Sequence, residues 1–273
     1  MWGENMTIKD TTIYKDIRKT YYALKNWDET KDRMAIVKKL RPYHDIHKGE
    51  RCFVIGNGPS LKAEDLTRIW NLDIPTFACN RIYMIFPQTE WRPTYYFISD
   101  AKIVAQYTDD VDGVPSDHRF FPKRYRDKIK NGIFYNELES DYEKDGKFSL
   151  NAAEGIYTAG TVTAEMLQFA YFMGFSEIYL IGVDFSYAIT NKIDDRTYKY
   201  EGESNYFVKD YLKPGEVADM PNIKANLLGF HAAREAIEAQ GRVVANATRG
   251  GKLEVFDRIN LDELLMKWEE EQR

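Results

Sequence analysis

Short apolar runs alternate with polar turns and helix-like segments along most of the chain. From residue 49 onward the apolar runs cover residues 51–55, 76–80, 95–99, 133–135, 177–185 and 242–245. Uninterrupted apolar runs are typical of strands that are covered on both faces, as in a parallel sheet. Helices are predicted at 62–70, in the segment that ends near Gly174, at 223–240 and at 262–273. This order predicts an α/β fold, a Rossmann-like, open, mostly parallel sheet with helices on both faces.

Residues 1–48 have a different pattern, in which aromatic and aliphatic residues recur at helical spacing among many charges. We expect an N-terminal helical extension that packs on the main domain or mediates a homo-oligomer, and a single Rossmann-like domain over residues 49–273. Acidic residues interrupt each basic cluster, so at most a peripheral membrane contact is expected. The N-terminus has no apolar signal segment and no apolar run is as long as a membrane span, which favours a cytoplasmic protein.

The amino-acid composition argues against some classes of function. The 38 Lys and Arg residues are outnumbered by 43 Asp and Glu residues, which gives a net charge of −5. Proteins that bind nucleic acid polymers usually carry a basic excess, so no such partner is expected. The two cysteines, Cys52 and Cys79, lie in apolar runs and are predicted to be free core thiols. The four histidines lack metal-ligand spacing, so no metal site is predicted from them.

The apolar runs share a further property, because each ends in small or polar residues. In open parallel sheets, ligands bind beyond the carboxyl ends of the strands. Polar groups from several strand ends are therefore predicted to meet in one crevice. These residues are Gly56, Asn57 and Gly58 after the first run, then Asn80, Asp100, Asp184 and Asn246.

The turn Gly56-Asn57-Gly58-Pro59-Ser60 resembles the start of a dinucleotide-binding fingerprint. Leu61 stands where that fingerprint has its last glycine, and Asn80 stands where an acidic residue would end the next strand. A nicotinamide-dependent enzyme is therefore not supported, and no Gly-Lys-Ser/Thr follows that would indicate a P-loop. The glycines allow close backbone approach, and backbone amides with the Ser60 hydroxyl are predicted to form an anion site. A tight turn without a ligand is the alternative.

A second helix N-terminus is predicted at Thr158-Ala159-Gly160-Thr161. Two such termini at one sheet edge could bind a phosphate, a diphosphate or a carboxylate, with ordinary helix capping as the alternative. Asp100 and Asp184 could bind ribose hydroxyls, a base amine or, through water, Mg²⁺, or they could cap neighbouring helices. The tyrosine-rich segment 188–221 is too long for an ordinary connection and is predicted to be a lid or a binding loop.

Several motifs together resemble the bacterial branch of the 6-hydroxymethylpterin diphosphokinase-like family. They are the glycine-rich turn, segments 93–100 and 160–175, Tyr179-Leu-Ile-Gly-Val-Asp184, and Asn246-Ala-Thr-Arg-Gly-Gly251. The resemblance implies a Rossmann-like fold for about residues 49–260. It also implies one of two activities. Archaeal members transfer diphosphate from ATP to a pterin with Mg²⁺, whereas many bacterial members are associated with surface polysaccharide or flagellin glycosylation.

The motifs are also similar to those of single-domain bacterial sialyltransferases of lipo-oligosaccharide synthesis. In that family the glycine-rich turn, the asparagine of a Cys-Asn pair and a Thr-Ser-Gly turn hold a sugar activated by cytidine monophosphate (CMP). Tyrosines in a mobile loop contact its phosphate. The similarity implies that the donor site of this chain contains Asn57, Ser60, Asn80, Ala159, Gly160 and Tyr206 or Tyr211.

The general base departs from the sialyltransferase pattern. Those enzymes use a histidine of the mobile loop, whereas this chain has no histidine between His118 and His231. Asp210 is the nearest candidate for deprotonating an acceptor hydroxyl. Lys209 or Tyr206 could stabilise the departing phosphate.

Three function classes follow. The favoured one is a glycosyltransferase that uses a nucleotide-activated sugar, expected to be a CMP-activated acidic sugar, on a glycan acceptor in surface polysaccharide synthesis and without a required cofactor. The alternatives are a diphosphokinase-like enzyme that uses ATP and Mg²⁺, with Asp100 and Asp184 near the metal, and a non-catalytic nucleotide-binding protein. The missing histidine favours the alternatives, whereas Asn80 and the tyrosine-rich loop favour the glycosyltransferase.

Overall fold

The computed structural model describes residues 27–116 and 118–273, so the predictions for residues 1–26 lie outside the described residues. A helix covers residues 27–40. The later helices are α2 (Ala63–Asn71), α3 (Ala101–Gln106), α4 (Thr108–Asp112), α5 (Val162–Phe172), α6 (Ile223–Glu238) and α7 (Leu261–Glu271). The short 3-10 helices are η2 (Arg41–Tyr43), η3 (Ile82–Gln88) and η4 (Lys123–Tyr125).

Within the described residues, the main sheet has eight parallel strands in the order β13-β12-β8-β1-β2-β3-β4-β5. The chain builds β1, β2, β3, β4 and β5 outward in one direction and then returns to place β8 on the other side of β1. The predicted Rossmann-like class is therefore confirmed, with its reversal of strand order between β1 and β8. The strands are β1 (Arg51–Ile55), β2 (Thr76–Cys79), β3 (Tyr95–Phe97), β4 (His118–Pro122), β5 (Ile133–Tyr135), β8 (Glu177–Ile181), β12 (Val243–Asn246) and β13 (Asp257–Arg258).

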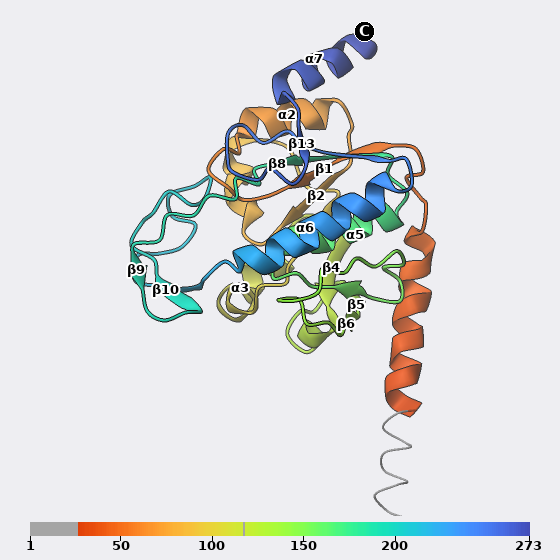
Figure 1. Cartoon of the computed structure of the whole chain (residues 1–273), viewed down its shortest axis with the longest axis vertical. Helices are drawn as coiled ribbons and strands as arrows, with labels where there is room; N and C mark the ends of the chain where they lie inside the picture. Colours follow the sequence, from red (N-terminus) through yellow and green to blue (C-terminus); the bar gives the residue numbers. More distant parts are fainter. Residues whose placement is uncertain (1–26, 117) are drawn as a thin grey trace, which may run out of the picture.

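Both faces of this sheet are covered, and successive residues of β1 point into different cores. Cys52 and Val54 pack with α5 and α6, whereas Phe53 and Ile55 pack with α2 and α7. Figure 1 shows α2 and α7 grouped together, away from α5 and α6. Every residue of α5 is buried, because this helix lies between the sheet and α6. Cys52 and Cys79 are free and buried, as predicted.

The described part of the N-terminal extension is helical, as predicted, and packs on the main domain. Ile36 and Leu40 enter the core on the α5 side, and Asp32 forms ion pairs with Lys123 and Arg126 at 2.5 Å each. The domain boundary at residue 48 and a role in oligomer formation stay predictions. No helix of the described residues is long and apolar enough to cross a membrane.

The long segment predicted as a lid has structure of its own. It contains β9 (Asn191–Lys192), β10 (Thr197–Lys199) and β11 (Val217–Asp219), which form a three-stranded antiparallel sheet. A small core of Tyr198, Tyr200, Tyr211 and Leu212 supports this sheet. We call residues 186–221 the cap; in Figure 1 its strands β9 and β10 project to the left of the main sheet. A two-stranded pair, β6 (Glu137–Leu138) and β7 (Ile156–Tyr157), completes the fold.

Candidate active site

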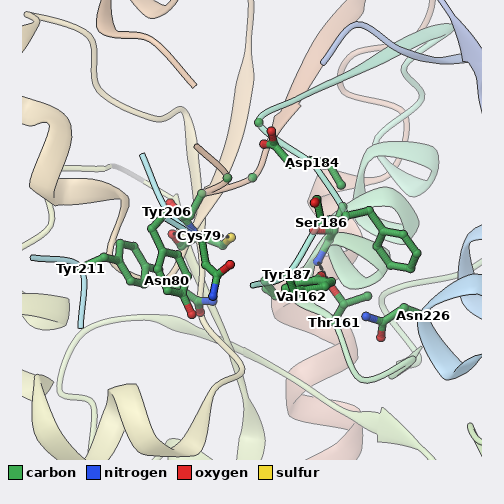
Figure 2. Close-up of a pocket in the computed structure, with 18 of the residues that line it drawn as sticks. Cys79, Asn80, Thr161, Val162, Asp184, Ser186, Tyr187, Tyr206, Tyr211 and Asn226 are labelled. Carbon is green, nitrogen blue, oxygen red and sulfur yellow. Dashed lines mark hydrogen bonds between the residues drawn. The ribbon is translucent and has the colours of Figure 1, made fainter. Parts of the chain in front are cut away.

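A cavity of about 150 Å³ opens at the carboxyl ends of β1, β2 and β8, where the strand order reverses. Figure 2 shows Asn80, Tyr206 and Tyr211 on one side of it and Asp184, Ser186 and Thr161 on the other. Of the residues named from the sequence, those that line it are Gly56, Asn57, Gly58, Asn80, Thr161, Asp184, Tyr206 and Tyr211. Ligand sites of open α/β sheets occupy this position.

The glycine-rich turn is held against the end of β8. The Gly56 amide donates to Ile181 O and the Gly58 amide to Gly182 O, each at 2.8 Å. A Cβ on Gly56 would lie 2.4 Å from Gly182 O, and a Cβ on Gly58 would overlap the Asp184 carboxylate. The glycines therefore serve close packing between two strand ends, in addition to any approach of a ligand.

Asp184 occupies part of the predicted anion site. The Ser60 hydroxyl donates to Asp184 Oδ2 at 2.8 Å and the Ser60 amide at 3.4 Å. Burial raises the pKa of Asp184, and the hydrogen bonds from Ser60 oppose that rise. The Ser60 hydroxyl is thus engaged by a carboxylate of the protein, and neither Ser60 nor Pro59 is among the cavity-lining residues.

Two asparagines present unpartnered acceptors at the cavity. Asn57 Nδ2 donates to Cys79 O at 3.1 Å, which fixes the orientation of its amide. Asn57 Oδ1 and Asn80 Oδ1 are buried and have no hydrogen-bond partner in the described part of the chain. Asn80 also has a left-handed backbone, with φ of 51°. Unpaired buried acceptors are costly, so a ligand that carries N–H or O–H donors would stabilise this arrangement.

The N-terminus of α5 faces the cavity from the opposite wall. The Thr161 side chain caps the helix by accepting from the Thr163 amide at 3.3 Å, and Thr161, Val162 and Thr163 all line the cavity. The positive end of the α5 dipole favours an anion there. Asn226 of α6 also lines the cavity, and its amide nitrogen can donate to Ala159 O at 2.7 Å.

Thr158, Ala159 and Gly160 form the turn before α5 and do not line the cavity. The Gly160 amide donates to the Thr158 hydroxyl at 3.4 Å. A Cβ on Gly229 would lie 2.2 Å from Ala159 Cβ, so this glycine lets α6 pack directly on the turn. The structure therefore gives these residues a role in positioning α5 and α6.

The cap contributes a tyrosine pair to the cavity. The rings of Tyr206 and Tyr211 stack at a centroid distance of 3.9 Å and an interplanar angle of 9°. Burial raises the pKa of both phenols well above the ordinary value, so both are protonated at neutral pH. The Phe207 amide donates to Asn57 O at 3.1 Å and ties the cap to the glycine-rich turn.

Lys209 and Asp210 lie on the same segment of the cap, but their side chains are exposed and outside the cavity lining. Tyr206 is the one of the three residues predicted for catalysis that contributes to the lining. Catalytic roles for Lys209 and Asp210 stay predictions.

Two of the predicted strand-end residues make hydrogen bonds away from the cavity. Asp100 caps α3, because its Oδ1 accepts from the Lys102 amide at 2.8 Å and from the Ile103 amide at 3.1 Å. Asn246 is fully buried and donates to Leu253 O at 3.0 Å. Neither lines the cavity.

The positions of Asp100 and Asp184 determine whether the two carboxylates could hold a Mg²⁺ ion together. One carboxylate caps a helix, the other is bound by Ser60, and they do not share the cavity. They therefore do not fit a shared Mg²⁺ site. Within the described ranges, no group of three or more His, Cys, Asp and Glu side chains is placed to hold a metal ion.

Several lining residues were not predicted individually as site residues, although Tyr187 and Asn205 lie beside and within the tyrosine-rich segment predicted to be a lid or a binding loop. They come from segments that only the fold brings to the cavity, namely the residues after Asp184, the cap and the first turns of α6. The strained φ of Phe185, 51°, is a backbone feature that sequence alone does not reveal. These residues are Phe185, Ser186, Tyr187, Asn205, Asn226 and Phe230.

The fold and the cavity together define a Rossmann-like α/β protein with a candidate ligand site at the reversal of strand order. Residues 22–190, more than half of the chain, match the family described as 6-hydroxymethylpterin diphosphokinase MptE-like. The chain belongs to this family.

Comparison with solved structures finds similarity to the MAf glycosyltransferase from Magnetospirillum magneticum AMB-1. The sequence identity is 17% and the TM-score 0.49, and the match covers 84% of this chain. The chain spans 38% of the length of that protein. No curated protein sequence matches the chain.

Proposed function

We propose that this protein is a glycosyltransferase that binds a nucleotide-activated sugar in the cavity described above. The observation that carries the proposal is the pair of unpartnered, buried acceptors, Asn57 Oδ1 and Asn80 Oδ1, at the carboxyl ends of β1 and β2. Nucleotides supply the complementary donors, namely ribose hydroxyls and an exocyclic base amine. The N-terminus of α5 and the protonated tyrosines on the facing walls suit a phosphate.

The favoured donor is a CMP-activated acidic sugar. The support for cytidine is the similarity of the glycine-rich turn, Cys79-Asn80 and the tyrosine-rich cap to the sialyltransferase motifs. A glycan acceptor, a role in surface polysaccharide synthesis and a cytoplasmic location rest on the same resemblance and belong to the proposal.

Transfer of the sugar requires an attacking hydroxyl, a base that takes its proton and groups that stabilise the leaving nucleotide. An acceptor hydroxyl attacks the anomeric carbon, the bond from that carbon to the phosphate oxygen breaks, and the nucleotide leaves with the bonding electrons. The hydroxyl proton passes to a base, for which Asp210 is our candidate. Hydrogen bonds to the phosphate from the α5 N-terminus, Tyr206 and Tyr211, with Lys209 nearby on the cap, would stabilise the charge of the leaving nucleotide.

The test is thermal unfolding in the presence of CMP, CDP, UDP, GDP, ATP and a pterin, each with and without Mg²⁺. A ligand present at 100 times its dissociation constant stabilises the native protein by about 2.7 kcal/mol. We expect CMP to raise the melting temperature without metal. Asn80→Ala should abolish this shift, because it removes an acceptor of the site.

The matched control is Asn136→Ala. Asn136 also has a buried amide atom without a partner, Nδ2, but it lies outside the cavity lining. This variant should keep the full response to CMP. Unchanged CMP binding by Asn80→Ala would contradict the assignment of the cavity.

The second candidate function is a diphosphokinase that uses ATP and Mg²⁺, which the family match favours. Stabilisation by ATP only together with Mg²⁺, or by the pterin, would support it and would contradict transfer from a CMP-activated sugar. The metal would then need ligands other than a shared pair of Asp100 and Asp184.

A further inference from the structure

Arg81 is a buried cation beside the candidate site. It directly follows Asn80 and is 7% exposed. Its guanidinium lies 3.9 Å from the ring centre of Tyr107 and 5.6 Å from that of Tyr211. Its Nε donates to the Tyr83 hydroxyl at 3.2 Å. These partners are neutral, but the Tyr83 hydroxyl in turn donates to Asp110 Oδ2 at 3.4 Å and the Tyr107 hydroxyl to Glu216 Oε1 at 2.9 Å.

Arg81 holds Tyr211 at two points. Its guanidinium donates to Tyr211 O, and its backbone amide donates to the Tyr211 hydroxyl oxygen at 3.1 Å. The Tyr211 ring is also stacked on Tyr206. Arg81 therefore fixes the main chain and the hydroxyl of Tyr211 relative to the end of β2, and Tyr206 of the cap fixes its ring.

This arrangement determines what the Tyr211 hydroxyl can do. A phenol has one O–H donor in addition to its acceptor capacity. The Arg81 amide uses an acceptor position of the oxygen, so the hydrogen of the hydroxyl must point away from that amide. Tyr211 lines the cavity, and burial keeps its phenol protonated at neutral pH. The remaining function of this group is donation to a ligand acceptor.

We propose that Arg81 is a positioning residue that fixes the Tyr211 hydroxyl as a hydrogen-bond donor to the phosphate of the bound ligand. This inference rests on the proposed nucleotide site. The phosphate then lies between Tyr211 and the N-terminus of α5, which occupy opposite walls in Figure 2.

The experiment measures the binding of CMP and of cytidine, which differ only in the phosphate, to the wild-type protein, Arg81→Lys, Tyr211→Phe and the double variant. A hydrogen bond to a charged group corresponds to about tenfold or more in affinity. We expect each single variant to weaken CMP by about tenfold and cytidine by less than about twofold. The double variant should be no weaker than Tyr211→Phe, because Arg81→Lys acts only through the hydroxyl that Tyr211→Phe removes: it replaces the guanidinium that holds Tyr211 O and keeps the backbone amide.

Arg92→Lys is the matched control. The Arg92 guanidinium also donates to main-chain oxygens, those of Thr89 and Trp91, and lies 4.3 Å from the ring centre of Phe86. It is outside the cavity lining, so this variant should bind both ligands as the wild type does.

Three outcomes contradict the inference. Equal weakening of CMP and cytidine by Arg81→Lys would indicate a purely structural role. Unchanged CMP binding by Tyr211→Phe would show that its hydroxyl does not contact the phosphate. Failure of the wild-type protein to bind any nucleotide would contradict the proposed function itself, and the inference with it.

Discussion

Glu165 is a carboxylate in the middle of the apolar core, one turn into α5. It is 1% exposed, and the Tyr135 hydroxyl donates to its Oε2 at 2.6 Å. Burial raises the pKa of Glu165, and hydrogen bonds from Tyr135, Ser99 and Thr158 and the charge of Arg124 oppose the rise. The burial of Cys79 raises the pKa of its thiol to about 12, with the charge of Glu165 as the second cause. A buried charge of this kind is tolerated only because several donors surround it.

The raised pKa of Glu165 predicts how the stability of the folded protein changes with pH. The folded protein binds this proton more tightly than the unfolded chain, whose ordinary value is 4.5. The resulting stabilisation is complete below about pH 4.5 and is lost as the pH rises through the folded pKa. Glu165→Gln keeps an acceptor for Tyr135 but does not titrate. We expect the melting temperature of the variant, relative to wild type, to increase from pH 4 to pH 8.

The control for this series is Glu254→Gln, which alters an exposed carboxylate. Its melting temperature is measured over the same pH range, so that the effect of removing an exposed carboxylate can be compared with that of removing Glu165. A difference for Glu165→Gln that is independent of pH would show that Glu165 keeps its ordinary pKa when the protein folds.

Single residues of the site were only partly predictable from the sequence. Asn57 and Asn80 line the cavity as expected, because a residue directly after a parallel strand lies at the sheet edge. Asp100 satisfies the same rule but caps α3. The sequence does not say whether a polar side chain at a strand end bonds to its own following helix or faces a neighbouring strand end.

At the scale of elements, the junction between the β1 and β8 turns depends on Gly58. A Cβ there would overlap the Asp184 carboxylate, which the Ser60 hydroxyl holds in place. Overpacking of this kind costs about 1–3 kcal/mol. For a protein of this size, each kcal/mol of lost unfolding free energy lowers the melting temperature by about 2–4 °C. We expect Gly58→Ala to show a decrease of this kind and to weaken ligand binding.

Gly113→Ala is the control for that variant. Its Cβ would lie 3.3 Å from the nearest atom, Asp109 O, and its φ is −85°, which any residue adopts. A loss of stability in Gly58→Ala no greater than in Gly113→Ala would contradict the tight contact between the two turns.

The elements themselves were predictable where apolar runs are long. β1, β2, β3, β5 and β8 lie within the predicted runs, although β8 ends at Ile181 rather than at residue 185. β12 extends one residue beyond its predicted run, to Asn246. The chain turns after Ile181 because Gly182 and Phe185 have left-handed φ values of 65° and 51°. β4 and the strands of the cap had no sequence signal. β4 begins with His118 and Arg119, which interrupt its apolar pattern, and the cap strands β9, β10 and β11 have only two or three residues each.

At the scale of the whole molecule, the sheet and the cap meet at the candidate site. Phe207 N donates to Asn57 O, and Arg81 binds Tyr211. Farther out, Lys102 pairs with Asp219 at 2.5 Å, and the Tyr107 hydroxyl donates to Glu216 at 2.9 Å. Surface ion pairs contribute little, so the contacts next to the cavity are expected to determine how firmly the cap is held.

A ligand that bridges the sheet and the cap should therefore slow local opening of the cap segment that touches it. Amide hydrogen exchange reports such opening, region by region. We expect CMP to slow exchange in residues 205–212 of the cap and 56–60 of the glycine-rich turn, both of which contain residues that line the cavity. Exchange in residues 191–199, the outer strands β9 and β10, should remain unchanged, because these residues do not line the cavity. The Asn80→Ala variant should show no response to CMP. Equal slowing across the entire cap would mean that it closes as one rigid unit, which would contradict local bridging by the ligand.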